Sequence, residues 1–319
     1  MHDRFHPLNR GFDEFFGFMG SMVHFFRSKH LYRGRENVRE DDYLTDVIAR
    51  ETNRFIERQK DGPFFVYAAF NFIHSPLEAR DEDLARFPDL TGKTRIKAAM
   101  TLAMDRAFGS ILETLRKHGL EEKTLIFLTN DNGDYSGNGP FSGGKGSVRE
   151  GGVRVPFFVQ WKGTLPPGRK WDGLVSTMDI LPTCVAAAGG RIDSAWKLDG
   201  VNLLPYLRGE ATASPHDVLY WRMGDSRAVR RGPWKLTWEG ASGYGQRPDP
   251  SSLRWRLYNL DEDIAEQKDV SEGRAETVAE LKTLYEKWNA ELIPPRWPFG
   301  GSGEMGQWDE VKADERKTP

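Results

Sequence analysis

The stretch that decides the fold is TLIFLTNDNG, residues 124–133. Its first residues, 124–128, form a short continuous apolar run, which is typical of a strand buried on both faces of a sheet. The glycine-rich polar stretch that follows, from Asn130 to Gly152, ends this strand. Ligands in open α/β sheets bind beyond the carboxyl ends of the strands. The stretch therefore predicts a core strand together with the edge at which a site would lie.

Two similar apolar runs predict further strands, one at residues 64–70 after Pro63 and one at residues 155–160. Helical spacing of apolar residues predicts helices near residues 42–56, 94–118 and 178–188, and Gly119 ends the second of them. Strands that alternate with helices are typical of an α/β protein, so we expect a mostly parallel sheet sandwiched by helices.

The pattern changes after about Gly200, where short strands separated by turns predict a small antiparallel sheet within residues 218–260. A helix at residues 275–292 would cover that sheet. Residues 5–40 have no clear period and are expected to be irregular. The expected domains are an α/β core at 1–205, an antiparallel-sheet subdomain with its closing helix at 206–293, and a loose tail at 294–319.

Composition excludes several classes of protein. The chain has 319 residues, 38% of them hydrophobic and 29% charged, and its formal net charge is -2. These values exclude disordered and collagen-like chains and argue against nucleic acid as a partner. No apolar run reaches about 18 residues, so we expect no membrane span. Cys184 is the single cysteine, which excludes an internal disulfide framework.

Polar residues that could carry chemistry follow the predicted strands. Asp131 and Asn132 offer one charged and one neutral oxygen ligand, a pair that suits a hard cation, although Asp-Asn-Gly is also an ordinary turn. Lys145 stands between glycines and could hold an oxyanion, or it could be a solvated loop lysine. His74 could donate a hydrogen bond or act as a general acid, or it could be a structural histidine.

The order of the motifs along the chain adds to what each one indicates. They are His74-Ser75-Pro76 after the apolar run 64–70, Asp105 and Gly109 on a helix, Asp131-Asn132-Gly133, Gly143-Gly144-Lys145-Gly146, Glu150-Gly151-Gly152-Val153-Arg154-Val155-Pro156, Asp179-Ile180-Leu181-Pro182-Thr183, Ala228-Val229-Arg230 with Trp234-Lys235-Leu236, and Leu257-Tyr258-Asn259-Leu260. In this order they resemble the C-terminal two-thirds of a sulfatase, which implies an incomplete alkaline-phosphatase-like core.

The resemblance implies hydrolysis of a sulfate ester by an enzyme of the arylsulfatase type, with a sulfated small molecule or carbohydrate as substrate. In the family the hydrate of a formylglycine, which is made from a Cys or Ser in a Cys/Ser-x-Pro-x-Arg motif, attacks sulfur and is later released as the aldehyde. Ca²⁺ (or Mg²⁺) polarises the sulfate. The resemblance further implies that Asp131 and Asn132 are metal ligands. Lys145 would bind the sulfate oxygens, and His74 would bind the sulfate or protonate the leaving alcohol.

The sequence contains no Cys/Ser-x-Pro-x-Arg motif, so no residue is predicted as the nucleophile. Cys184 corresponds to an apolar core position. We therefore expect this chain to be inactive by itself, and we expect weak metal binding because Ca²⁺ takes about six to eight oxygen ligands. We also expect association through an exposed sheet edge.

Two other classes of function stay open at this point. The chain could be a non-catalytic remnant or an interaction subunit that keeps the fold alone. It could also be a related phosphoesterase, although the Gly-Gly-Lys-Gly and Leu-Pro-Thr patterns argue against that reading.

Overall fold

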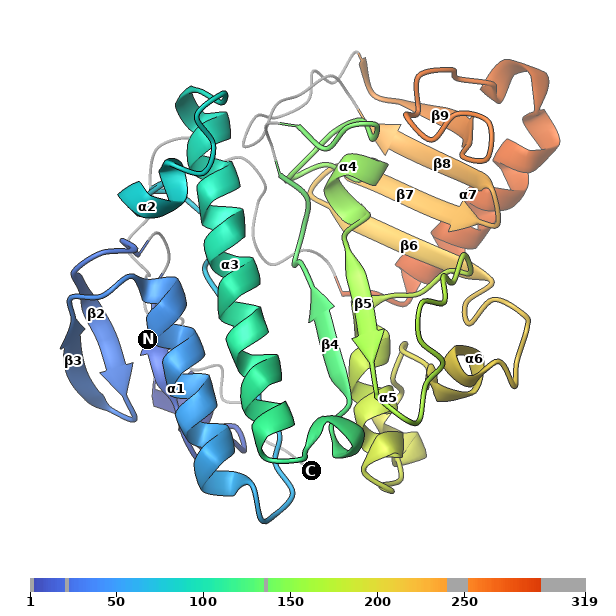
Figure 1. Ribbon diagram of the computed structural model, residues 1–319. Coiled ribbons are helices and arrows are strands. Elements are labelled where there is room, and N and C mark those ends of the chain that lie inside the picture. The colour runs from blue at the N-terminus through green and yellow to red at the C-terminus, as the bar shows by residue number, and fades with distance from the viewer. Residues whose placement is uncertain (1–2, 21–22, 135–136, 240–251, 294–319) are drawn as a thin grey trace. The chain divides into compact units, whose positions relative to one another are not determined.

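A computed structural model of the chain describes residues 3–20, 23–134, 137–239 and 252–293 (Figure 1). The predicted loose tail 294–319 lies outside the described residues. The chain forms two compact units, Met1–Thr124 and Leu125–Pro319, and the predicted boundary near residue 205 stays a prediction. In the described part of the chain, every helix is too short or too polar to cross a lipid bilayer.

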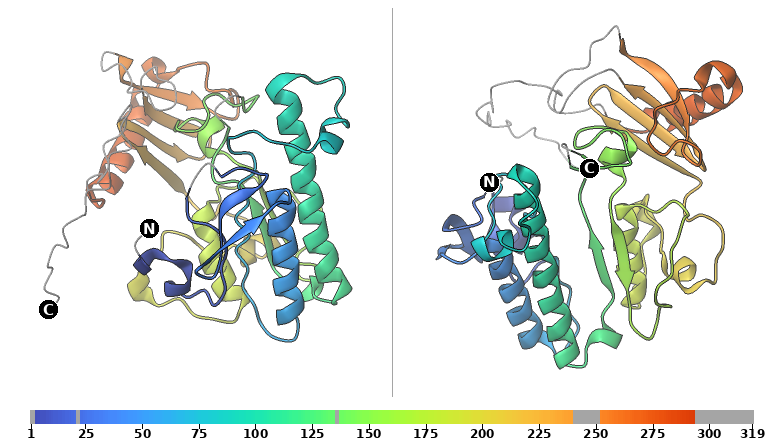
Figure 2. Two further views of the ribbon diagram at one scale, coloured as in Figure 1. Left: turned by 90° about the vertical axis from the view of Figure 1, so that its left-hand side faces the viewer. Right: turned by 45° about the horizontal axis from the view of Figure 1, so that its top comes forward.

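Two long helices, α1 (Leu44–Gln59) and α3 (Gly92–Lys117), lie side by side in the first unit (Figure 2). They confirm the helices predicted from apolar spacing. The α3 stripe is buried where the spacing requires, and it includes Met100, Ala103, Ala107, Ile111 and Leu115. The helix ends where predicted, because Gly119 takes a left-handed φ of +66°. A short helix, α2 (Asp81–Leu84), precedes α3.

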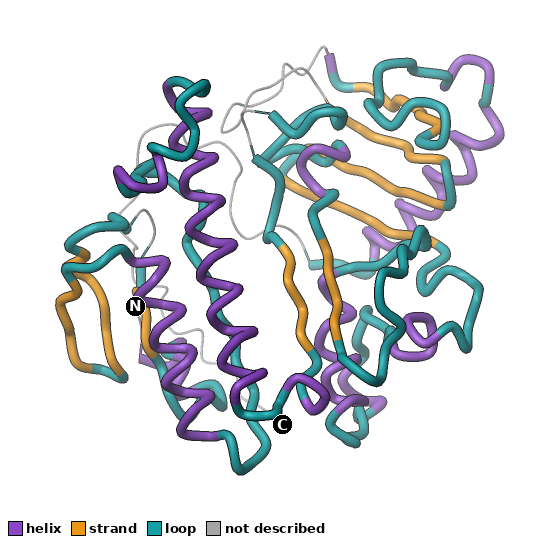
Figure 3. Tube along the Cα trace, viewed as in Figure 1, coloured by secondary structure: helices purple, strands orange, loops and turns teal. Residues whose placement is uncertain are grey.

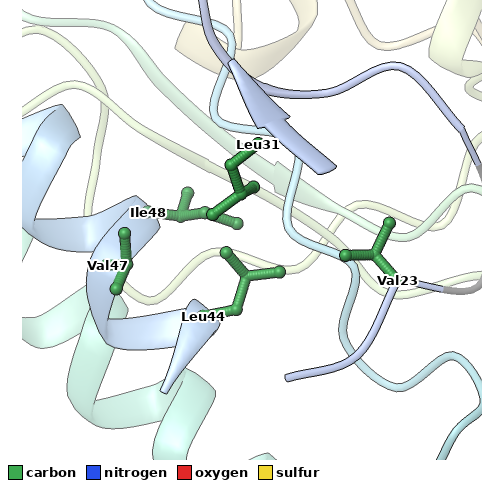
Figure 4. Close-up of a cluster of buried hydrophobic side chains, with 5 residues drawn as sticks. All are labelled: Val23, Leu31, Leu44, Val47 and Ile48. Carbon is green, nitrogen blue, oxygen red and sulfur yellow. The ribbon is translucent and has the colours of Figure 1, made fainter. Parts of the chain in front are cut away.

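The N-terminal segment is more regular than predicted. It forms a three-stranded antiparallel sheet of β1 (Phe16–Phe18), β2 (Ser28–Arg33) and β3 (Glu36–Glu40). The prediction of irregular structure was wrong because the register shifts between Ser28 and Leu31, and this irregularity breaks the alternation that a sequence pattern shows. The apolar core between this segment and α1 contains Val23, Leu31, Leu44, Val47 and Ile48 (Figure 4).

Residues 64–70 do not form the predicted strand. They are assigned to no strand, and no backbone hydrogen bond joins them to the rest of the described chain. Their burial still alternates, since Phe64 and Val66 are half-buried whereas Phe65 and Tyr67 are 61% and 74% exposed. The apolar run was correctly identified, but within the described residues it lacks the neighbouring strands that would make it part of a sheet.

The second unit begins with two paired strands, β4 (Ile126–Thr129) and β5 (Phe157–Gln160). Both were predicted, but they pair antiparallel, with Thr129 opposite Phe157. The prediction of a mostly parallel sheet is not confirmed, since every strand pair in the described chain is antiparallel. The short helices of this unit are α4 (Glu150–Val153), α5 (Ile180–Ala187) and α6 (Leu204–Arg208).

A four-stranded antiparallel sheet follows, as predicted (Figure 3). Its strands, in spatial order, are β6 (Val218–Met223), β7 (Ser226–Arg231), β8 (Trp234–Glu239) and β9 (Arg254–Asn259). The closing helix, α7 (Ala275–Ala290), packs on it through Leu281 and Tyr285, which contact the buried Val229, Leu236 and Leu257. The predicted C-terminal arrangement of sheet and helix is confirmed.

The open segment 63–70 generates a prediction about association. The average molar mass from light scattering rises with protein concentration when a chain self-associates. We expect Phe65→Ser combined with Tyr67→Ser to reduce this rise, because exposed aromatic residues on an unpaired segment promote self-association. Phe5→Ser is the matched control, since Phe5 is 50% exposed in the same unit but lies outside the segment. Equal association of the double variant and the unmodified chain would contradict this expectation.

Candidate functional site

The loop at residues 130–156 joins β4 to β5 and contains three of the four predicted site residues. Since Thr129 lies opposite Phe157, the antiparallel pairing brings the two ends of this loop together. Asp131 and Asn132 follow β4 after Asn130, near the point where the chain later returns into β5. The sequence placed these residues correctly at a strand end, although the partner strand runs in the opposite direction to the one expected.

Backbone hydrogen bonds fold the loop back on itself. The Gly133 amide donates to the Gly152 carbonyl at 3.1 Å, and the Gly151 amide donates to the Ser142 carbonyl at 2.7 Å. The Lys145 amide donates to the carbonyl of Asp134 at 3.3 Å. The structure therefore brings the backbone of Lys145 to the stretch that also carries Asp131 and Asn132.

A side-chain amide and a close backbone approach hold the two halves of the loop together. The Asn138 side chain accepts a hydrogen bond from the Asp134 amide at 2.8 Å and donates to the carbonyls of Asp134 and Gly143. At Gly133 the chains are so close that an added Cβ would stand 1.8 Å from the Gly151 carbonyl oxygen. Only glycine fits there.

The cation ligands predicted at this loop are a partial set. Asp131 is exposed, and one of its carboxylate oxygens accepts the Asn132 amide at 2.9 Å, while the Asn132 side chain is half-buried. Among the described residues, no group of three or more His, Cys, Asp or Glu side chains could hold a metal ion. Asp131 and Asn132 supply oxygen ligands, which are the type that a hard cation prefers. Their number is smaller than the about six to eight ligands that Ca²⁺ takes.

His74 lies in the first unit, in the segment after residues 63–70. Its side chain is exposed, and its Nδ1 stands 2.8 Å from the Ser75 carbonyl oxygen. Since a carbonyl oxygen can only accept, Nδ1 carries a proton in this contact and Nε2 is the ring nitrogen left for other partners. Two hollows of this unit, of about 520 and 280 Å³, are lined by residues such as Arg80 and do not include His74.

A cluster of buried charges anchors the loop to the C-terminal sheet. Lys235 on β8 is fully buried, and its ammonium lies 2.8 Å from Glu150 Oε1 and 3.0 Å from Glu266 Oε1. Both glutamates are 1% exposed. Arg154 and Arg230 add further cationic contacts to Glu150 at 3.1 and 3.4 Å. The loop and the sheet are thus joined by three buried charges, those of Lys235, Glu150 and Glu266, with the partly exposed Arg154 and Arg230 at their edge.

Two further contacts extend this junction. The Arg149 guanidinium is paired with Glu239 on β8. The second carboxylate oxygen of Glu266 accepts hydrogen bonds from the Ser142 hydroxyl at 3.1 Å and from the Glu150 amide at 2.7 Å. Glu266 itself has a left-handed φ of +53°, which is unusual for a residue with a side chain.

The two buried carboxylates differ in their acidity. Burial alone would raise the pKa of Glu150, but Lys235, Arg230 and Arg154 lower that pKa below its ordinary value of 4.5. Burial raises the pKa of Glu266 above 4.5, although Lys235 and the Glu150 amide act in the opposite direction. Glu150 is therefore the carboxylate that the surrounding cations stabilise in its charged form.

Glu266, Glu239 and Asn138 were not predicted as part of the site. The sequence offered one usable signal, because Lys235, Thr237 and Glu239 alternate with apolar residues along β8. Alternating polar residues are normally read as a solvated face, whereas here that face is buried. No local pattern marks Glu266, since its partners lie far away in the sequence.

Comparison with known proteins identifies the family of this chain. The sulfatase family model matches residues 1–190, and the chain belongs to the sulfatase family. The uncharacterized sulfatase YdeN of Escherichia coli is 36% identical over 228 residues, which cover 69% of this chain and 40% of that protein. The N-acetylgalactosamine-6-sulfatase of Canis lupus familiaris is 32% identical over 268 residues, which cover 74% of this chain and 50% of that protein. The chain thus spans half or less of the length of these relatives.

A solved structure supports the same assignment. Ps i-CgsB in complex with k-i-k-neocarrahexaose is 31% identical and superposes with a TM-score of 0.83 over 94% of this chain and 71% of that one. This similarity confirms the predicted sulfatase fold in its overall form, although the described strand pairs are antiparallel.

The charge cluster generates a prediction about pH. We expect Glu150→Gln to lower the free energy of unfolding at pH 7 by about 1.5–3 kcal/mol, because hydrogen bonds to a charged group are lost. A lowered pKa means that the ionised Glu150 stabilises the fold above pH 4.5 and stops doing so as the pH falls through its folded-state value. The difference in urea midpoint between unmodified and variant chains should therefore shrink from pH 7 to pH 3.

The exposed Glu272 provides the control for this measurement. Glu272→Gln should leave the urea midpoint nearly unchanged at both pH values, since surface carboxylates contribute little. A Glu150→Gln difference that stays the same from pH 7 to pH 3 would contradict the assignment of Glu150 as the stabilised carboxylate.

Proposed function

We propose that this chain carries the oxyanion-binding part of a sulfatase site and acts in the hydrolysis of a sulfate ester, by way of its loop 130–156. The observation that supports the proposal most is the backbone folding of this loop, which ties Lys145 to the stretch with Asp131 and Asn132. Membership of the sulfatase family supplies the reaction class.

Each predicted residue has a role in this proposal that its chemistry permits. The Lys145 ammonium binds sulfate oxygens as a point charge on a half-buried loop. His74 lies in the other unit, and donation from it to a sulfate oxygen or to the departing alcohol stays a prediction. Because Nδ1 donates to the Ser75 carbonyl, such donation through Nε2 requires the doubly protonated imidazolium. Asp131 and Asn132 would hold a divalent cation, Ca²⁺ or Mg²⁺, which when bound supplies Lewis-acid polarisation of the sulfate.

The proposed substrate is a sulfated carbohydrate. Relatives above 30% identity include an N-acetylgalactosamine-6-sulfatase and a protein solved with a neocarrahexaose. The finer class of arylsulfatase and the expectation that this chain does not turn over substrate by itself both stay predictions. A binding measurement is therefore a better first test than an activity assay.

We expect Lys145→Met to weaken the binding of inorganic sulfate to the 319-residue chain by about ten-fold, since one charge-assisted interaction with the anion is lost. Isothermal titration calorimetry at low ionic strength measures the change, and Mg²⁺ or Ca²⁺ can be included in parallel titrations. The methionine keeps the length and apolar stem of the side chain, so the loop should stay folded.

Lys170→Met is the matched control, because Lys170 is an exposed lysine of the same unit outside the loop. It removes the same net charge and should leave sulfate affinity within a factor of about two. Equal sulfate affinities of the Lys145→Met and Lys170→Met variants would argue against an oxyanion-binding role for Lys145.

A further inference from the structure

We propose that Lys235, held between Glu150 and Glu266, is a positioning residue that fixes the loop presenting Lys145. The role of Lys145 as the oxyanion ligand rests on the function proposed above, whereas the positioning of the loop rests on geometry alone. The C-terminal sheet is then part of the machinery that holds the site in shape.

Glu266 tethers the loop at two separate places. Its Oε2 accepts the Ser142 hydroxyl at 3.1 Å and the Glu150 amide at 2.7 Å, so a single carboxylate oxygen binds both ends of residues 142–150. Lys145 lies within this segment. A loop that is closed at both ends has few conformations, and the backbone that carries Lys145 is held close to one arrangement.

Lys235 keeps Glu266 and Glu150 in these positions. Its ammonium contacts one oxygen of each carboxylate, at 2.8 Å for Glu150 and 3.0 Å for Glu266, and it lies 5.6 Å from the centre of the Trp221 ring. None of the Lys235 side chain is exposed. Without this cation two buried carboxylates would face each other, an arrangement that proteins avoid by moving or protonating one of the groups.

Side chains along β8 point alternately to the two faces of the sheet, which allows this strand to contact both the apolar core and the loop. Leu236 points to the face covered by α7, where it packs with Val229 and Leu257. Lys235 and Glu239 alternate with it on the opposite face, and they pair with Glu150 and Arg149 of the loop. One strand therefore joins the apolar core of the sheet to the loop of the candidate site.

Native-state hydrogen–deuterium exchange of the full chain tests the proposal at the amides of Gly133, Lys145 and Gly151, which form the hydrogen bonds that close the loop. We expect Lys235→Met to speed exchange at these amides by at least about ten-fold, because the loop is no longer tethered. Amides of α1 and α3 in the first unit should be unaffected.

Leu281→Ala is the matched control, since Leu281 is 1% exposed and packs with Leu236 on the face of the sheet opposite to Lys235. It should destabilise the unit while leaving the loop amides protected under native conditions. Loop amides that exchange equally fast in both variants at equal global stability would show that Lys235 has only a general structural role, and would overturn the proposal.

Ser142→Ala and Glu266→Gln keep the test decisive if Lys235→Met does not fold. Ser142→Ala removes one tether, and Glu266→Gln keeps an acceptor for the Glu150 amide but removes the charge beside Lys235. Each should speed exchange at Lys145 while the strands β7 and β8 stay protected. No acceleration in either would overturn the positioning role. The exchange measurement does not depend on sulfate, so the two proposals can fail separately. If Lys235→Met speeds exchange of the loop amides but the unmodified chain binds no sulfate, the proposed function fails and the positioning role of Lys235 stands.

Discussion

The contact of the buried Lys235 ammonium with the Glu150 and Glu266 carboxylates is the interaction on which the candidate site depends. Buried ion pairs add little net stability compared with apolar groups of the same size, but leaving one partner unpaired is costly. The cluster therefore acts mainly by excluding other arrangements of the loop. Segments that are far apart in the sequence must stay together for the three charges to remain paired.

Backbone geometry adds a second constraint in the same place. The Gly133 amide meets the Gly152 carbonyl, and the approach of Gly133 to Gly151 leaves no room for a side chain. Antiparallel pairing of β4 and β5 closes the base of the loop. Three sets of contacts thus hold the loop that carries Asp131, Asn132 and Lys145. They are the pairing of β4 with β5, the close approach of Gly133 to Gly151, and the buried charges around Lys235. Under the proposed function, such an arrangement would let the loop bind an anion without reorganising.

Much of this structure could be predicted from the sequence, and what could not be predicted has physical reasons. The helices α1 and α3 and the C-terminal sheet were predicted because their apolar spacing is local and regular. Residues 64–70 were wrongly predicted as a strand, since apolar character indicates burial but not the presence of a neighbouring strand. The direction of the β4–β5 pairing was also missed, because strand direction depends on the path of the chain and not on composition.

In the candidate site, too, local sequence patterns could be recognised, whereas contacts between residues distant in the sequence could not. Asp131, Asn132 and Lys145 could be singled out because they follow a predicted strand in a recognisable order. The structure places them in one loop, and their roles stay predictions. Glu266 could not be found, since its role comes from contacts with Ser142 and Glu150, which lie far from it in the sequence. Lys235 belonged to a recognised motif, but an alternating polar strand face does not by itself reveal that the face is buried.

A crystal structure of the 319-residue chain grown with Ca²⁺ and sulfate tests the central claim most directly. The account predicts a sulfate oxygen within about 3 Å of Lys145 Nζ, together with an intact contact of Lys235 with Glu150 and Glu266. A loop displaced from β8, or Lys145 turned to solvent while the anion binds elsewhere, would contradict it.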